Sequence, residues 1–291
     1  MRRKQLAQMP AEEAAKILDQ HCQFCDQLLV PTFLTPTVAG KMRYLTIWPE
    51  CGCAQSMTYR TALKKSEQAA REKAGLELYQ AKLRKAGLIG WLAGATFGNY
   101  KPRPDWPAAT KCKERVQVYG MSFLDGDLPV GKNWLILFGD YGLGKSHLGA
   151  AIIREAIDAG MQNVYFRVWP EYLKRLQATF NNNNSDGETE QEISAELQQG
   201  QLVVIDDLDK RQPSEWVKGT LYEVLNYRYN HGLPTVLTFN YGPDDVAAKA
   251  PGRLALEDYL GRAVIDRLIG AAYDMVEFVG PSYRSGIEFT V

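Results

Sequence analysis

The stretch Gly139-Asp140-Tyr141-Gly142-Leu143-Gly144-Lys145-Ser146 has the pattern G-x-x-x-x-G-K-S, which is typical of a phosphate-binding P-loop. The apolar run at 134–138 indicates a buried strand directly before it, and residues 147–159 have a helical pattern directly after it. Glycines let a backbone approach a phosphate closely, and a helix N-terminus adds partial positive charge there. The order strand, glycine loop, helix therefore predicts a nucleotide-binding site.

Each residue of this loop has an expected task. The Lys145 ammonium is expected to reach the β- and γ-phosphates of ATP, and the Ser146 hydroxyl is expected to bind Mg²⁺. The other loop residues from Gly139 to Gly144, together with His147, complete the candidate nucleotide-binding set. A glycine turn with a chance lysine is the alternative, and the flanking strand and helix disfavour it.

A second motif follows about sixty residues later. Four apolar residues at 202–205 predict a buried parallel strand, and Asp206 and Asp207 stand at its carboxyl end. Ligands bind at that edge of an open α/β sheet. Asp206 is therefore expected to hold Mg²⁺, and Asp207 to orient or deprotonate the attacking water. Many ATPases place a glutamate at the second position, so the shorter aspartate suggests slow hydrolysis.

The remaining pattern alternates strands and helices, which predicts a parallel, three-layer α/β sheet. We expect its five strands at 134–138, 164–168, 202–206, 235–239 and 275–279. The fourth strand ends in Asn240, a polar residue in position to face the γ-phosphate and the attacking water. A helix at 257–269 contains Arg262, Asp266 and Arg267. Either arginine could simply form a surface salt bridge with Asp266 or Glu257.

Four of the five cysteines form two close pairs, Cys22-x-x-Cys25 and Cys51-x-Cys53. The run 43–48 between the pairs alternates and indicates a strand. Two such pairs around a hairpin-like stretch suit a tetrahedral, structural Zn²⁺ site, whose metal would supply the folding energy of a small module. His21 could replace one ligand, and four unrelated thiols are the alternative.

Changes in composition along the chain predict four successive segments. We expect an amphipathic arm at 1–20, a zinc-binding module at 21–60, a mostly polar helical linker at 61–87 and a nucleotide-binding domain at 88–291. Glycines and prolines at 87–115 mark the last boundary. The first 120 residues carry an excess of Lys and Arg, which suits either nucleic acid or a solvated helix. Phe97 and Tyr100 could line an adenine slot or simply pack.

The composition is ordinary for a soluble globular protein: 45% hydrophobic, 23% charged, with zero formal net charge. There is no apolar run of membrane-spanning length, and no secretory h-region follows the basic N-terminus. The sequence therefore predicts a cytoplasmic protein that has no membrane partner.

Together these motifs resemble those of AAA+ ATPases of the DnaC/DnaI helicase-loader type, whose core the transposon helper IstB shares. The resemblance rests on Gly139–Ser146, on the runs 203–208, 238–240 and 264–268, and on Gly-Pro-Ser-Tyr-Arg at 280–284. It covers the chain from about residue 20 onward. The four-asparagine insert after residue 180 departs from the pattern.

By this resemblance, Asn240 matches sensor 1, Arg267 matches an arginine finger acting on a neighbour's ATP, and Arg284 matches a late arginine of the sensor 2 kind. It implies an ATPase that self-associates and loads a DnaB-type replicative hexameric helicase onto single-stranded DNA during replication initiation. The first alternative is an IstB-like transposase helper acting on duplex DNA. A small-molecule P-loop kinase is the second, although no lid or acceptor-binding signature is visible.

Overall fold

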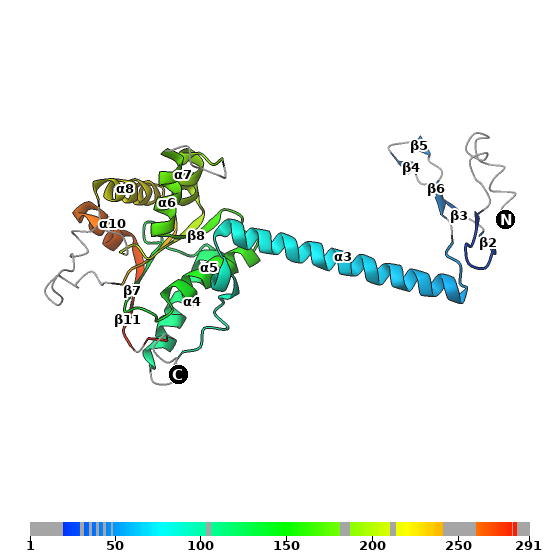
Figure 1. Cartoon of the computed structure of the whole chain (residues 1–291), viewed down its shortest axis with the longest axis horizontal. Helices are drawn as coiled ribbons and strands as arrows, with labels where there is room; N and C mark the ends of the chain where they lie inside the picture. The colour runs from blue at the N-terminus through cyan, green and yellow to red at the C-terminus, as the bar shows by residue number, and fades with distance from the viewer. Residues whose placement is uncertain are drawn as a thin grey trace. The chain divides into compact units, whose positions relative to one another are not determined.

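The computed structural model describes residues 20–29, 32–34, 37–38, 41–42, 45–47, 49–102, 106–180, 187–209, 214–240, 260–280 and 282–283 (Figure 1). The expected arm at 1–20 lies, apart from its last residue, outside this part, as do the insert at 181–186 and Arg284. Contacts divide the chain into two compact units, Met1–Leu78 and Tyr79–Val291. Each unit is described by itself.

The first unit contains three short antiparallel strand pairs and the start of a long helix. Strands β1 (Gln20–His21) and β2 (Leu28–Leu29) form one pair, β3 (Thr32–Leu34) and β6 (Leu45–Ile47) the second, and β4 (Thr37–Val38) and β5 (Lys41–Met42) the third. The strand expected at 43–48 is thus present as β6. Helix α3 (Ala54–Ala86) begins directly after the second cysteine pair.

The second unit is built on a parallel sheet whose strand order is β11-β7-β10-β9-β8. Its strands are β7 (Trp134–Gly139), β8 (Val164–Val168), β9 (Leu202–Asp206), β10 (Thr235–Thr238) and β11 (Ala272–Phe278). The predicted second and third strands match at both ends, and the ends of the other three differ by at most three residues. Continuous apolar runs suit these strands because both faces of the sheet are covered.

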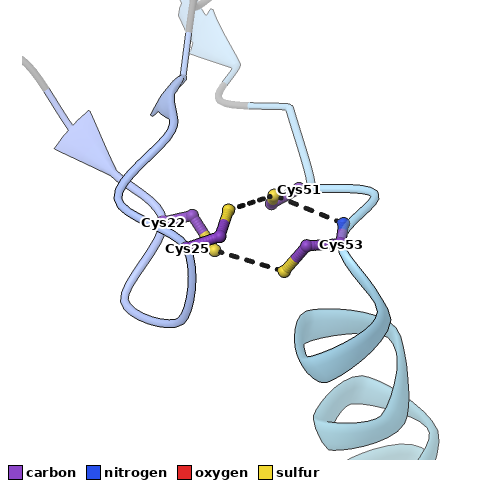
Figure 2. Close-up of side chains that lie close together, drawn as sticks. All are labelled: Cys22, Cys25, Cys51 and Cys53. Carbon is purple, nitrogen blue, oxygen red and sulfur yellow. Dashed lines mark hydrogen bonds between the residues drawn. The ribbon is translucent and has the colours of Figure 1, made fainter.

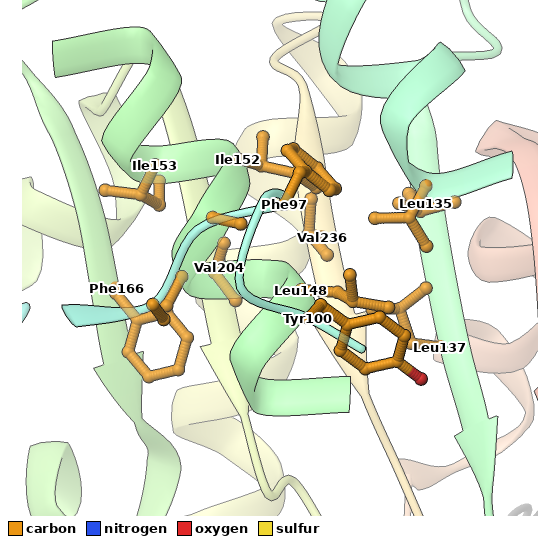
Figure 3. Close-up of a cluster of buried hydrophobic side chains, with 14 of the residues drawn as sticks. Phe97, Tyr100, Leu135, Leu137, Leu148, Ile152, Ile153, Phe166, Val204 and Val236 are labelled. Carbon is orange, nitrogen blue, oxygen red and sulfur yellow. The ribbon is translucent and has the colours of Figure 1, made fainter. Parts of the chain in front are cut away.

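Helices cover the two faces of this sheet (Figure 1). One face packs on the 3₁₀ turn η1 (Gly90–Gly94), α4 (Ala108–Asp125) and α5 (Lys145–Asp158); the other packs on α6 (Trp169–Phe180), α7 (Glu190–Gln199), α8 (Glu215–Asn230) and α10 (Arg262–Ala271). Alternate residues of β7 serve the two cores: Leu135 and Leu137 enter the first, Trp134 and Ile136 the second. Figure 3 shows part of the first core.

Helix α4 is the main element that the sequence did not predict. Prolines before it indicated an irregular boundary, but Pro107 occupies the N-cap with φ −59°, where its fixed dihedral suits the start of a helix. Val116 and Tyr119 are fully buried against the sheet, so α4 belongs to the second unit. The helix that was predicted from 257 is described from Arg262 onward.

The last turns of α3, from Tyr79 onward, are part of the second unit and pack within it. The Tyr79 hydroxyl donates to Asp158 Oδ1 at 2.7 Å and accepts from Arg154 Nη1 at 2.8 Å. The Arg167 guanidinium donates to the carbonyl of Lys85 at 3.0 Å, near the end of the helix. These contacts explain why the division between the units falls inside α3, before Tyr79, rather than at its end.

Candidate functional site

The P-loop needs glycine at several of its positions. Gly139, Gly142 and Gly144 have φ of +116°, +74° and +89°, a region that other L-residues rarely adopt. A Cβ on Gly139 would lie 2.1 Å from the Phe278 carbonyl oxygen, and one on Gly144 would lie 2.4 Å from the Tyr100 ring. The loop therefore passes close to β11 on one side and to an upstream aromatic ring on the other.

Lys145 is the first residue of α5, and its side chain folds back over the loop. Its Nζ donates to the carbonyls of Gly139 and Asp140 at 2.7 and 2.8 Å. Burial lowers the pKa of Lys145, and the carboxylates of Asp209 and Asp207 oppose that shift. The ammonium is thus held within the loop, beside a group of acidic side chains.

One carboxylate oxygen of Asp206, at the end of β9, accepts hydrogen bonds from two hydroxyl groups. Ser146 Oγ donates to Asp206 Oδ1 at 2.9 Å, and Thr238 Oγ1 donates to the same atom at 2.6 Å. The structure therefore brings together the two residues predicted to bind Mg²⁺. A hydroxyl and a carboxylate are hard oxygen donors, which is the chemistry that Mg²⁺ prefers.

Asp207 and Asn240 follow neighbouring strands and lie at the same sheet edge. Asp207 has φ +58°, a strained value for aspartate, and its backbone N–H donates to Thr238 Oγ1 at 2.9 Å. Asn240 is held by Asp209, which accepts from the Asn240 backbone N–H at 2.7 Å and from Nδ2 at 2.8 Å. Sequence reasoning missed Asp209, although a third acidic residue two positions after the Asp206-Asp207 pair was visible.

A cavity of about 480 Å³ opens over this edge of the sheet. Its lining includes most of the predicted nucleotide-binding residues: Tyr141, Gly142, Leu143, Gly144, Lys145, Ser146, His147, Asp207 and Asn240. Gly139 and Asp140 instead contact Lys145 through their carbonyls, and Asp206 is linked to the lining through Ser146. These candidate residues therefore lie in or directly beside one cavity.

The other residues that line the cavity are Trp91, Asn99, Tyr100, Lys101 and Tyr283. Of these, only Tyr100 was considered from the sequence as a residue that lines the nucleotide site. The Tyr100 hydroxyl donates to the carbonyl of Leu143 at 3.1 Å, and the His147 ring bonds the carbonyl of Thr96 at 2.9 Å. Tyr100 therefore lines the cavity. Phe97, the other residue weighed for an adenine slot, is buried in the core (Figure 3).

The predicted arginines lie elsewhere or outside the described residues. Arg267 on α10 donates to the carbonyl of Ala263 at 2.7 Å and to the Tyr222 hydroxyl at 3.3 Å. Its guanidinium carbon lies 5.1 Å from the centre of the Tyr222 ring and 5.8 Å from that of Tyr229, both on α8. Arg267 does not line the cavity of its own chain.

The four predicted cysteines converge in the first unit (Figure 2). The Sγ atoms of Cys22 and Cys53 are 3.8 Å apart, those of Cys25 and Cys51 are 3.5 Å apart, and all four lie within 4.8 Å of one another. A Zn–S bond of about 2.3 Å in a tetrahedron gives S···S edges of about 3.8 Å. The cluster therefore has the donor set and spacing for a zinc ion.

Backbone N–H groups point at these sulfur atoms. Phe24 donates to Cys22 at 3.5 Å and Ser56 donates to Cys53 at 3.4 Å. The hydrogen bond from Phe24 is the main cause that lowers the pKa of Cys22 to about 6. A hydrogen bond from Gln27 opposes the neighbouring cysteines at Cys25, whose pKa is nevertheless raised, so one thiolate of this pair is favoured over the other. His21 instead bonds the carbonyl of Asp26 at 2.9 Å and is outside the cluster.

This strand order, glycine loop and pair of acidic residues define a P-loop ATP-binding domain of the AAA+ type. Residues 111–288 match the family described as IstB-like ATP binding protein, and the chain belongs to that family. The match covers the sheet, the P-loop and the edge that carries Asp206, Asp207 and Asn240. It leaves the four-cysteine cluster and α3 outside.

Similar proteins come from two biological settings. The replicative helicase loader DnaC of Escherichia coli is 24% identical over 263 residues, covering 90% of this chain and 94% of DnaC. An insertion-sequence ATP-binding protein of Mycobacterium tuberculosis is 27% identical over 230 residues, covering 78% of this chain and 81% of that relative. The DnaC crystal structure aligns with a TM-score of 0.52 at 20% identity, over 66% of this chain and 100% of that chain, which supports the fold.

Within the described part of the chain, every helix is too short or too polar to cross a membrane.

Proposed function

We propose that this chain is an ATP-dependent loader that delivers a DnaB-type replicative helicase onto single-stranded DNA during replication initiation, in the cytoplasm. The supporting observation is the length of the similarity to DnaC, which spans 94% of that loader. An alignment of 263 residues is longer than the stretch matched by the ATP-binding family. The similarity therefore extends beyond the ATPase core into the segment that precedes it.

The cavity residues have distinct roles in this proposal. Lys145 would offset the charge of the ATP phosphates, and Ser146 and Asp206 would hold Mg²⁺, which supplies positive charge for phosphoryl transfer. Asp207 positions or deprotonates the attacking water, and Asn240 contacts the water and the γ-phosphate from the neighbouring strand. Hydrolysis at this site would switch the loader between its holding and releasing states.

Arg267 acts between subunits in this proposal. Its guanidinium is kept on the surface of α10 by Tyr222 and Tyr229, and it does not face the cavity of its own chain. An arginine is always charged and binds phosphate oxygens through two donors, so it suits a neighbour's ATP as negative charge develops. Self-association through the ATPase domain would complete each site. Arg284 remains a proposed phosphate contact on sequence alone.

The proposed division of labour follows the two units. The zinc-binding module at 21–60, preceded by the arm at 1–20, holds the helicase, the linker at 61–87 joins it to the ATPase, and the domain at 88–291 senses ATP and DNA. When bound, Zn²⁺ supplies the crosslink that a module of this small size needs. Residues from Tyr79 onward pack with the ATPase, so an isolated domain should begin there.

The alternative is an IstB-like transposase helper acting on duplex DNA. It is favoured by the family match and by the insertion-sequence relative at 27% identity. The four-cysteine cluster lies outside residues 111–288, so the helper's core does not require it. The added module therefore favours the loader.

Affinity purification of the tagged, full-length chain from its own cells, with ATP present, tests the proposal. A Lys145→Ala variant serves as the control, because ATP-dependent capture should be lost with the phosphate-binding ammonium. Recovery of a DnaB-type helicase supports the loader. Recovery of a transposase without helicase would establish the helper instead.

A further inference from the structure

Residues 207–209, which follow β9, form several hydrogen bonds with residues 238–240 at the end of β10. Asp207 adopts its strained φ of +58°, and its N–H bonds Thr238 Oγ1. Leu208 is fully buried, and its N–H donates to the Thr238 carbonyl at 3.2 Å. Asp209 then reaches Asn240 with both carboxylate oxygens. A strained conformation that is so well supported is typical of functional sites.

The two hydrogen bonds from Asn240 to Asp209 fix the orientation of an amide. An ionised carboxylate only accepts hydrogen bonds, so the nitrogen of the Asn240 amide must face Asp209 and its carbonyl oxygen must face away. The second hydrogen bond, from the Asn240 backbone N–H, keeps the Asp209 carboxylate beside Asn240. Asn240 lines the cavity, whereas Asp209 does not, so Asp209 can influence the cavity surface through Asn240.

Burial and hydrogen bonding act in opposite directions on the charge of Asp209. Burial raises the pKa of Asp209, and the two hydrogen bonds from Asn240 oppose that rise by stabilising the charged form. Lys145 also feels the Asp209 charge. A neutral side chain here would lose the orienting effect and would change the field at the P-loop ammonium.

We propose that Asp209 is a positioning residue for ATP hydrolysis: it locks the Asn240 amide in the one orientation that presents its carbonyl oxygen and second N–H to the cavity. The inference rests on the ATPase activity of the proposed function. Without Asp209, the amide can flip, and donor and acceptor exchange places at the point where the attacking water would be oriented. Binding of ATP depends mainly on the P-loop and should persist.

The test is a kinetic double-mutant cycle on the full-length protein, with kcat measured by phosphate release and ATP affinity by a fluorescent ATP analogue. Asp209→Ala should lower kcat about tenfold or more, as loss of an orienting partner commonly does, with ATP affinity within about threefold of the parent. Asp209→Asn keeps an acceptor for Asn240 Nδ2 but meets the backbone N–H with a donor, so its kcat should be intermediate. Exposed Asp127→Asn is the matched control and should match the parent.

The cycle separates positioning from a general structural role. If Asp209 acts through Asn240, adding Asp209→Ala to Asn240→Ala should leave kcat at the Asn240→Ala value. Multiplied effects in the double variant, an unchanged kcat in Asp209→Ala, or a loss of ATP affinity without a loss of kcat would each overturn the inference. Helicase capture by the parent protein tests the loader function separately. Failure of the Asp209 proposal can therefore be distinguished from failure of the proposed loader function.

Discussion

Replacing Arg228 with methionine should destabilise the ATPase unit strongly, although this residue is remote from the P-loop. Arg228 on α8 is fully buried. Its guanidinium donates to Thr235 Oγ1 at 2.8 Å and to the carbonyls of Leu197 and Gly200 at 2.9 Å, and it also bonds the Pro234 carbonyl. One side chain thus satisfies the carboxyl end of α7 and the start of β10.

The magnitude follows from what methionine leaves behind. Methionine has a similar length and fills most of the space, so the main loss is hydrogen bonding. Hydrogen bonds to charged groups contribute roughly 1.5–3 kcal/mol each, and a buried acceptor left without a donor costs about 1–3 kcal/mol. Relief from burying the charge offsets part of this, since burial itself disfavours the guanidinium. We expect a net loss of about 3–5 kcal/mol.

Thermal unfolding followed by circular dichroism measures this loss. At roughly 2–4 °C per kcal/mol for a unit of this size, Tm should fall on the order of 10 °C. The relevant transition is the one that ATP shifts upward, because ligand binding stabilises only the folded nucleotide site. Arg115→Ala, which breaks a half-exposed ion pair with Asp274, is the control and should cost about 1 kcal/mol or less. A Tm within about 2 °C of the parent for Arg228→Met would refute the reasoning.

Four further outcomes are expected. Lys145→Ala should weaken ATP binding about 100-fold or more in a titration, because the charge facing the phosphates is lost; parent-like affinity would contradict the P-loop assignment. Asp207→Asn should bind ATP normally but lose about 100-fold in kcat, and hydrolysis at the parent rate would exclude its role with water. Elemental analysis should find one Zn²⁺ per chain, lost in Cys25→Ser; a metal-free chain with a folded N-terminal unit would disprove the zinc site. Arg267→Ala should bind ATP and helicase but lose DNA-stimulated hydrolysis, and full stimulation would remove the intersubunit finger.

The sheet and the P-loop were predictable because their signals are local. The apolar runs at 134–138 and 202–205 are continuous, as buried parallel strands require, and glycines mark the one loop between a strand and a helix. Helices α6, α7 and α8 also carry local signals, since each begins at a recognisable capping or proline position. The carboxyl edges of parallel strands then bring Ser146, Asp206 and Asn240 together.

The parts that could not be predicted depend on contacts distant in sequence. Asp209 and Asn240 are 31 residues apart, and nothing near either one indicates their bond. Arg228 lies in a turn of α8 that contains other polar residues, and arginine side chains are usually exposed. Its complete burial could therefore not be predicted from the sequence. The sequence does not distinguish Phe97 from Tyr100: both are buried in the first core, and only Tyr100 also lines the cavity.

Loading onto a closed DNA circle tests the central claim most directly. A ring-shaped helicase cannot thread onto a circular single strand that lacks an end, so a loader must place it there. We would mix the purified helicase from the same cells with this protein, ATP and a single-stranded circle that carries one annealed oligonucleotide, and measure oligonucleotide release. The account predicts rapid release that requires the full-length chain and is lost with Lys145→Ala. Release that is equally fast without this protein, or absent with it, would contradict the loader function.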